Sequence, residues 1–157
     1  MNDTERGAFD VAVSLLSHKM RSRRTLVERL LQKGFSEKQA QGAVDKLTEL
    51  RILDDAAYAE RMAAHCRAKG YGAGRFRRML IEKKVDREAM DAVLAEYEPD
   101  DDKVRSLVAA AFSGQPPDRA TVKKVSDKLF RLGHAWDDIS RYIGAYRDSA
   151  ETENDAV

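Results

Sequence analysis

Three copies of one apolar pattern run through this chain and constrain its fold more than any other feature. Seven apolar positions in residues 26–47 fall on seven further apolar residues after a shift of 50 residues. A shift of 99 residues again gives apolar residues at six of the seven positions, with His134 at the other. A fixed period of this kind is typical of repeat proteins, in which neighbouring units share a core. The positions in the first copy are Leu26, Leu30, Leu31, Phe35, Ala40, Val44 and Leu47.

The spacing within and between the copies is that of α-helices. Apolar side chains recur three or four positions apart along most of the chain. One such face precedes the first copy and consists of Phe9, Val13, Leu16 and Met20. Gly34 follows a helical stripe and predicts a left-handed helix end, because glycine has no Cβ to oppose that conformation. Gly70 and Gly133 indicate helix ends in the same way, so the sequence predicts an all-α protein.

Turn and cap signals divide these helices into repeats. Ser36 with Gln39 three residues later predicts a capping box at a helix start. We place the three repeats at residues 8–53, 54–98 and 99–147, with flexible termini at 1–7 and 148–157. Each repeat is too small to bury a large core alone. We therefore predict an elongated tandem array of three three-helix repeats, each similar to a helix-turn-helix unit.

Composition excludes several classes of protein. No apolar run approaches the length of a membrane span. The first ten residues, MNDTERGAFD, do not have the basic start and apolar core of a secretory signal. Cys66 is the single cysteine and cannot form an internal disulfide, which fits a reducing compartment. These features predict a cytoplasmic protein with no membrane partner.

Two adjacent acids, Asp54 and Asp55, raise the question of a catalytic or metal-binding pair. Side chains on consecutive helical residues point about 100° apart, and a metal site needs more ligands than two. An aspartate at a helix start instead accepts hydrogen bonds from free first-turn amides. The run Asp100–Asp102 repeats this arrangement before the third repeat. We predict that Asp54 and Asp55 begin a helix, and a metal-dependent phosphohydrolase is the disfavoured alternative.

The remaining candidates for chemistry are weaker. His18, His65 and His134 have no metal-ligand spacing between them. Cys66 shares its apolar stripe with Tyr58 and Met62, which predicts a buried and unreactive thiol. The glycines of residues 70–74 have no preceding strand and no following Gly-Lys-Ser/Thr, so we interpret this stretch as a flexible connector. The sequence predicts no enzyme, no metal and no cofactor.

Basic residues are concentrated in two segments although the formal net charge is only +1. Residues 19–33 hold six basic residues against one acid, and residues 67–84 hold seven against one. Such runs form either a solvated face or a surface for phosphates or acidic proteins. Tyr71 is either a stacking platform for nucleic acid or a cover for the connector. The candidate binding residues are Arg67, Lys69, Arg75, Arg77 and Arg78, supported by Arg21, Arg23 and Arg24.

Four short motifs resemble those of the RecX family, which regulates the RecA recombinase. They are KGF at residues 33–35, LDD at 53–55, Tyr58-Ala59, and KGYGAGR at 69–75. The resemblance covers residues 8–147, and the third repeat matches mainly by its pattern. One departure is Lys83-Lys84-Val85, where a glycine is expected, so we predict a different helix end there. The residues that match the family's motifs are Lys33, Gly34, Phe35, Leu53, Asp54, Asp55, Tyr58, Gly70 and Gly72.

The resemblance implies a non-enzymatic protein that binds RecA, chiefly as its filament on single-stranded DNA. Proteins of this family lie in the filament groove and restrain filament extension, ATP hydrolysis and strand exchange. They thereby influence recombinational repair and the SOS response. We expect a monomer. A direct DNA-binding protein of the helix-turn-helix type is the alternative, because basic three-helix units also fit that class.

Overall fold

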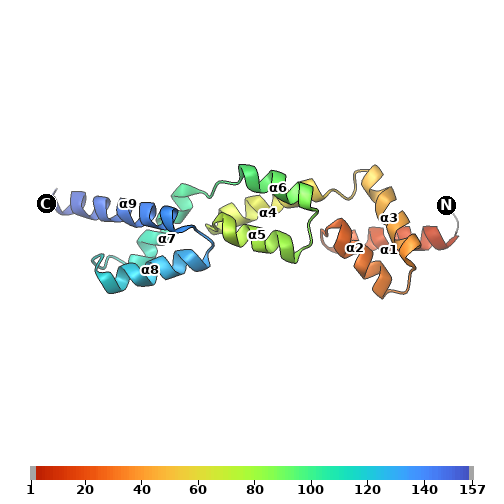
Figure 1. Ribbon diagram of the computed structural model, residues 1–157, viewed down its shortest axis with the longest axis horizontal. Helices are drawn as coiled ribbons and strands as arrows, with labels where there is room; N and C mark the ends of the chain where they lie inside the picture. The colour runs from red at the N-terminus through yellow and green to blue at the C-terminus, as the bar shows by residue number, and fades with distance from the viewer. Residues whose placement is uncertain (1–2, 156–157) are drawn as a thin grey trace. The chain divides into compact units, whose positions relative to one another are not determined.

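The computed structural model describes residues 3–155, and this range contains nine α-helices and no strand (Figure 1). The prediction of an all-α repeat array is confirmed. The helices are α1 (Asp3–His18), α2 (Arg23–Gln32), α3 (Glu37–Glu49), α4 (Asp55–Lys69), α5 (Ala73–Glu82), α6 (Arg87–Glu96), α7 (Asp101–Phe112), α8 (Arg119–Arg131) and α9 (Trp136–Asp155).

The same turn ends α2, α5 and α8, the second helix of each repeat. Its central residue is left-handed in all three, with φ of 99° at Gly34, 54° at Lys84 and 94° at Gly133. The following amide donates to the carbonyl five residues earlier, which closes the helix end. These bonds are Phe35 N to Leu30 O, Val85 N to Leu80 O and His134 N to Leu129 O, at 3.2, 3.1 and 3.1 Å. The glycine predictions at 34 and 133 are confirmed.

The prediction that the helix at Lys84 ends differently is wrong. A side chain in the left-handed region costs about 1–2 kcal/mol relative to glycine. Lys84 offsets part of this cost, because its ammonium lies 2.7 and 2.6 Å from the two carboxylate oxygens of Glu28. The pair is partly exposed and contributes at most about 1 kcal/mol. The turn is therefore set by its backbone hydrogen bonds rather than by its residue type.

The described chain separates into two compact units. Among the described residues, unit 1 comprises residues 3–62 and 79–95, and unit 2 comprises residues 63–78 and 96–155. The boundaries lie within α4, within α5 and at the end of α6, so they differ from those of the sequence repeats. The repeat boundaries at 8–53, 54–98 and 99–147 stay a prediction.

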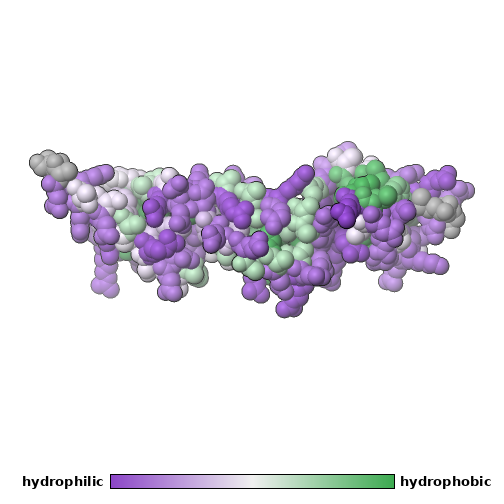
Figure 2. All heavy atoms as spheres, turned by 90° about the horizontal axis from the view of Figure 1, so that it is seen from above, coloured by the Kyte–Doolittle hydropathy of each residue, from purple (hydrophilic) through white to green (hydrophobic). Residues whose placement is uncertain are grey.

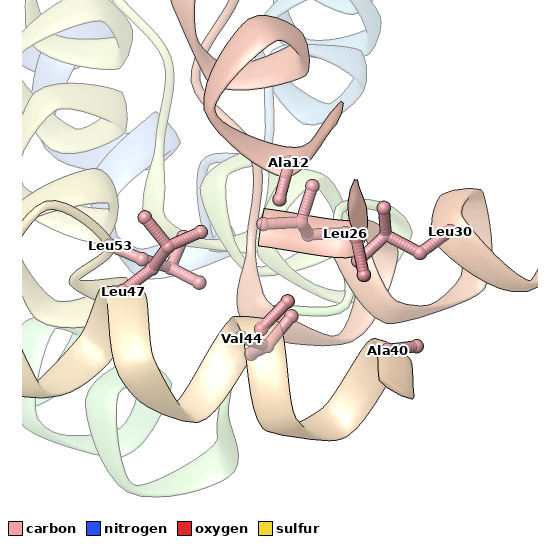
Figure 3. Close-up of a cluster of buried hydrophobic side chains, with 9 residues drawn as sticks. Ala12, Leu26, Leu30, Ala40, Val44, Leu47 and Leu53 are labelled. Carbon is pink, nitrogen blue, oxygen red and sulfur yellow. The ribbon is translucent and has the colours of Figure 1, made fainter. Parts of the chain in front are cut away.

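The core of unit 1 is formed where α1, α2 and α3 converge (Figure 3). Small residues of α1, Ala8 and Ala12, are fully buried against leucines of α2 and apolar residues of α3. Of the predicted face, Phe9 and Leu16 pack against this core, whereas Val13 is exposed, so the prediction is wrong at Val13. Consecutive helix positions are about 100° apart, and the alanine face turns Val13 outward. The buried set is Ala8, Ala12, Leu26, Leu30, Ala40, Ala43, Val44, Leu47 and Leu53.

One repeat position that the pattern assigns to the core lies at the surface. Leu31, Ile81 and Phe130 correspond in the three copies and are 37%, 54% and 54% exposed. The position immediately before it, at Leu30, Leu80 and Leu129, is buried in all three. An apolar residue next to a core position is therefore not itself a core residue, because it points about 100° away.

Hydrogen bonds define the start of α3 as the sequence predicts. The Gln39 amide donates to the Ser36 hydroxyl at 3.2 Å, and the Ser36 amide donates to the Gln39 side-chain oxygen at 2.9 Å. The predicted capping box is confirmed. These bonds satisfy two amides that otherwise lack a partner at a helix start.

The core of unit 2 includes apolar faces of α7, α8 and α9. The Phe112 and Tyr146 rings stack with centroids 4.1 Å apart, and the Phe76 and Tyr97 rings are tilted with centroids 4.6 Å apart. Aromatic pairs of this kind stabilise the core by about 0.5–1.5 kcal/mol beyond the burial of their apolar area. The buried cluster of these three helices is Val104, Val108, Phe112, Val125, Leu129, Ile139, Tyr142 and Ile143.

Helix occupies most of the segments that we expected to be frayed. α1 already begins at Asp3, and α9 continues to Asp155. Asp3 and Glu5 lie in the first turn of α1, where negative charge suits the helix dipole. Residues 1, 2, 156 and 157 lie outside the described residues. The mobility of both ends stays a prediction.

A buried hydroxyl in unit 2 predicts an acid-sensitive interaction. The Tyr142 hydroxyl donates to the Asp101 carboxylate at 2.5 Å. This bond, with the Arg141 and Arg105 charges, lowers the pKa of Asp101, while burial and the Asp101 carboxylate raise the pKa of Tyr142 to about 12. Because the pKa of this carboxyl is lower in the folded state than in the unfolded state, its ionised form stabilises the fold at pH values above the unfolded-state pKa. This stabilisation is lost as the pH falls through the folded-state pKa. We expect Tyr142→Phe to remove most of it.

Thermal unfolding of the wild type and Tyr142→Phe between pH 3 and pH 7 measures this effect. The wild-type advantage should shrink as pH falls below about 4, because the Asp101 carboxyl then binds a proton in the unfolded state before it does so in the folded state. In addition, a carbon-detected NMR titration should show the pKa of Asp101 rising in the variant. A difference in stability that is the same at every pH would contradict the assignment.

Candidate interaction surface

The five predicted binding residues of the second basic segment lie in unit 2 and have two different environments. Lys69, Arg77 and Arg78 are exposed and form no ion pair with any residue in the described part of the chain. Unpaired surface guanidinium and ammonium groups are available to carboxylates or phosphates of a partner. These three side chains are the strongest candidates for binding.

The other two arginines of the segment contact aromatic rings of the same unit. The Arg75 guanidinium lies 4.0 Å from the centre of the Tyr71 ring. The Arg67 guanidinium lies 5.2 Å from the centre of the Tyr97 ring, and its Nε donates to the Glu98 carbonyl at 3.2 Å. Cation–π contacts of this kind hold a side chain in place without removing its charge. Tyr71 therefore supports Arg75, and this contact occupies one face of its ring.

Backbone hydrogen bonds fix the glycine-rich connector of residues 70–74. The Gly72 amide donates to the Leu132 carbonyl at 2.8 Å, and the Gly74 amide donates to the Gly133 carbonyl at 3.0 Å. The His134 Nε2 donates to the Gly70 carbonyl at 2.9 Å. α5 already begins at Ala73, within the predicted connector. The prediction of a flexible connector is therefore wrong: its glycines permit close packing against the turn of residues 132–134.

The single cysteine and one of the histidines are buried side chains. Cys66 is fully buried, and burial raises the pKa of its thiol against the opposing charges of Arg75 and Arg67. A raised pKa reduces the thiolate fraction, which agrees with the predicted unreactive thiol. His134 is also buried and edge-on to Tyr142, with ring centroids 5.8 Å apart.

The first basic segment lies in unit 1, and two of its three predicted residues form ion pairs there. Arg23 lies 3.1 Å from Asp45, and Arg24 lies 3.9 Å from Glu28. Arg21 is half-buried, and its Nε is buried without a hydrogen-bond partner in the described chain. These contacts make the first segment the weaker binding candidate.

Asp54 and Asp55 begin α4, as predicted, but with separate roles. The Asp54 carboxylate accepts from the amides of Ala56 and Ala57 at 3.0 and 3.2 Å, as a helix cap does. The Asp55 carboxylate is 6% exposed and accepts from two distant amides, those of Arg23 at 2.9 Å and Asp86 at 2.8 Å. In the described chain, no cluster of three metal-ligating side chains includes either acid. Both carboxylates therefore have backbone amides at helix starts as partners.

Most of the other motif residues also have structural positions. Leu53 is buried in the core of unit 1, and Phe35 packs against that core. Burial raises the pKa of Tyr58. Gly70 is left-handed at the end of α4, with φ of 75°. Lys33 is exposed and caps the end of α2.

Family comparison matches the two segments that carry these motifs. Residues 8–47 match the model described as "RecX, first three-helix domain", and residues 54–94 match "RecX, second three-helix domain". The chain belongs to the RecX family. A relative named "Regulatory protein RecX" from Stenotrophomonas maltophilia (strain R551-3) is 36% identical over 132 residues. The match covers 83% of this chain and 81% of the relative.

Further RecX relatives extend the match in sequence and in fold. The "Regulatory protein RecX" of Chlorobium phaeobacteroides (strain BS1) is 25% identical over 150 residues, which cover 83% of this chain and 99% of the relative. A crystal structure of RecX from Lactobacillus salivarius has a TM-score of 0.83 at 21% identity. It covers 94% of this chain and 99% of that chain, and it supports the fold. The name shared by these relatives, "Regulatory protein RecX", describes a regulatory role for the family.

Two apolar surfaces were missed by the sequence reasoning. In Figure 2, the most apolar area of the visible face lies over the α1–α3 part of unit 1. In unit 1, Val13 and Ile52 are exposed and line a cavity of about 210 Å³. In unit 2, the exposed rings of Phe130 and Trp136 stack with centroids 5.2 Å apart. The sequence feature that could have indicated this second surface is the aromatic residue on each side of the Gly133 turn. Within the described residues, no helix is long and apolar enough to cross a membrane.

Proposed function

We propose that this protein is a non-enzymatic regulator of the RecA recombinase. It binds RecA and the RecA filament on single-stranded DNA, lies in the filament groove, and inhibits filament extension, ATP hydrolysis and strand exchange. It thereby modulates recombinational DNA repair and the SOS response. It acts in the cytoplasm as a monomer and needs no cofactor. The observation that carries the proposal is the match of both three-helix domains to the RecX family.

The free cations of unit 2 support a partner with negative charge. Lys69, Arg77 and Arg78 are exposed, so pairing with carboxylates of RecA does not break ion pairs within the described chain. Charge complementarity of this kind raises the association rate and selects the partner. Arg67 and Arg75 extend the surface, although aromatic contacts restrict their movement.

The same cations favour one alternative, direct binding to DNA. Basic three-helix units bind duplex DNA in helix-turn-helix proteins, and phosphate contacts supply much of that affinity. Direct phosphate binding weakens steeply as salt rises, because it releases counterions. Salt dependence on naked DNA therefore separates the two functions.

Fluorescence anisotropy of the labelled protein tests the proposal. Single-stranded DNA is titrated alone, and then as a filament coated with RecA and a non-hydrolysable ATP analogue, across a salt series. We expect tight binding to the coated DNA only. The double variant Arg77→Glu/Arg78→Glu should weaken filament binding at least about tenfold, since it places negative charge opposite acidic groups.

A second double variant controls for net charge. Lys124 and Lys128 of α8 are exposed in the same unit, and Lys124→Glu/Lys128→Glu changes the net charge equally. We expect this control to bind nearly as the wild type does. Equal binding of the wild type to naked and coated DNA would favour the DNA-binding alternative. No binding to the filament would refute the proposal.

A further inference from the structure

A cavity in unit 2 has an aromatic wall and one free cation. Its volume is about 540 Å³, within the range of small-ligand sites. Residues from α5, the α6–α7 connection, α8 and the start of α9 line it, including Arg78, Tyr97, Pro99 and Phe130. Trp136 extends the wall outward, because its ring stacks on that of Phe130 at an interplanar angle of 16°.

The stacked pair is unusual for the surface of a charged protein. Phe130 is 54% exposed and Trp136, the only tryptophan, is 56% exposed. Single exposed apolar residues need no explanation, but two stacked rings beside a cavity have the geometry of an interface hot spot. Aromatic residues and arginine dominate the binding energy of such hot spots.

The charges around the cavity select the chemistry of its occupant. Arg78 has no acidic partner in the described chain, whereas Asp138, which also lines the cavity, pairs with Arg141 at 3.5 Å. The cavity therefore has one unpaired positive group beside an apolar wall. A carboxylate next to a large apolar side chain matches this arrangement.

Nucleic acid fits the same cavity less well. Asp137 and Asp138 directly follow Trp136 in the first turn of α9. A strand whose bases stacked on the rings would bring its phosphates near these two carboxylates, and like charges repel. Single-strand sites instead have cations along the backbone path.

We propose that this cavity, with the Phe130–Trp136 pair, binds a peptide segment of RecA that presents a large apolar side chain next to an aspartate or glutamate. The proposal rests on the proposed function and names the part of the partner that unit 2 contacts. The apolar side chain enters beside Phe130 and Trp136, and the carboxylate pairs with Arg78. The protein thereby recognises RecA through apolar contact as well as through charge.

Alanine variants of the full-length protein test the contribution of each group. Filament affinity is measured by anisotropy with RecA-coated single-stranded DNA. Phe130→Ala and Trp136→Ala should each weaken binding at least about tenfold, as truncation of a hot-spot residue does. Arg78→Ala should weaken it about fivefold or more. The matched controls are Leu50→Ala, at an exposed apolar residue of unit 1, and Arg119→Ala, at an exposed arginine of unit 2 outside the cavity. Both should change the affinity less than about twofold.

Photo-crosslinking identifies the occupant. Phe130 is replaced by p-benzoylphenylalanine, the complex with RecA-coated DNA is irradiated, and the labelled partner is sequenced by mass spectrometry. We expect a crosslink to a RecA peptide with an acidic residue close to the apolar attachment site. A crosslink to DNA, or to a RecA peptide without an acidic residue, would overturn the proposal.

The outcomes separate this inference from the function on which it rests. Wild-type binding to the filament with unchanged binding by Phe130→Ala and Trp136→Ala overturns the inference and leaves the proposed function intact. Absence of wild-type binding overturns both. Far-UV circular dichroism checks that each variant is folded, and the exposure of both rings predicts that it is.

Discussion

Replacing Gly133 by alanine should destabilise unit 2 by about 2–5 kcal/mol. Gly133 has φ of 94°, a conformation that costs an alanine about 1–2 kcal/mol. A Cβ at this position would also lie 2.2 Å from the Arg75 amide nitrogen, which is backbone and cannot rotate away. The start of α5 must therefore move from the Gly133 turn, and the hydrogen bond from the Gly74 amide is lost.

A second glycine separates the two causes. Gly34 occupies the same position of the first repeat with φ of 99°, but a Cβ there would meet no atom within 4 Å. Gly34→Ala should therefore cost only the conformational term, about 1–2 kcal/mol. The excess loss in Gly133→Ala measures the close approach of the two backbones.

The stability of unit 2 is measured by thermal unfolding followed by tryptophan fluorescence. Trp136 is the only tryptophan and lies in that unit, so its signal reports the unit that the substitution disturbs. We expect the midpoint in Gly133→Ala to fall by about 10 °C or more. Equal losses in Gly133→Ala and Gly34→Ala, with far-UV circular dichroism as the common probe, would show that the backbone contact contributes nothing.

The sequence predicts features that depend on neighbouring residues. The Gly34 and Gly133 helix ends and the Ser36–Gln39 capping box each depend on residues within one turn, and all are confirmed. The repeat pattern also predicts the α-helical fold, because its apolar residues recur three or four positions apart, as they do on one face of a helix. The pattern fails at Val13 and Phe130, which are both exposed. In α1 the buried face is formed by alanines instead of Val13, and in α8 the core position is Leu129, which precedes Phe130.

Features that depend on distant residues could not be predicted. Gly72 suggests a loose connector in the sequence, yet a Cβ there would lie 2.4 Å from the carbonyl oxygen of Gly133, 61 positions away. No local signal encodes such a contact. The candidate site shows the same division: the charge runs include Arg77 and Arg78, but only the fold places Arg78 in one cavity with Phe130, on which Trp136 stacks.

Removing the Asp55 carboxylate should destabilise unit 1 by about 2–4 kcal/mol. One carboxylate oxygen accepts from the Arg23 amide at the start of α2, and the other accepts from the Asp86 amide just before α6. Hydrogen bonds to a charged group contribute about 1.5–3 kcal/mol each, and the positive ends of two helices add to the attraction. In Asp55→Ala, both amides lose this acceptor.

Asp54→Ala provides a matched control one residue away. The Asp54 carboxylate is exposed and accepts only from amides of its own helix, so its loss should cost about 1 kcal/mol. Urea unfolding followed by circular dichroism compares the two variants. Asp55→Asn should also destabilise, because its amide group offers a donor where one backbone amide needs an acceptor.

Amide hydrogen exchange tests the assigned bonds directly. The amides of Arg23 and Asp86 should exchange at least about tenfold faster in Asp55→Ala, while Asp54→Ala should leave both unchanged. A metal-binding pair would behave differently: magnesium or manganese would raise the unfolding temperature of the wild type, and either substitution would abolish that rise. We expect neither metal to have an effect, since each acid already has backbone amides as its partners. Protection that persists at Arg23 and Asp86 in Asp55→Ala would show that the carboxylate does not join the two helix starts.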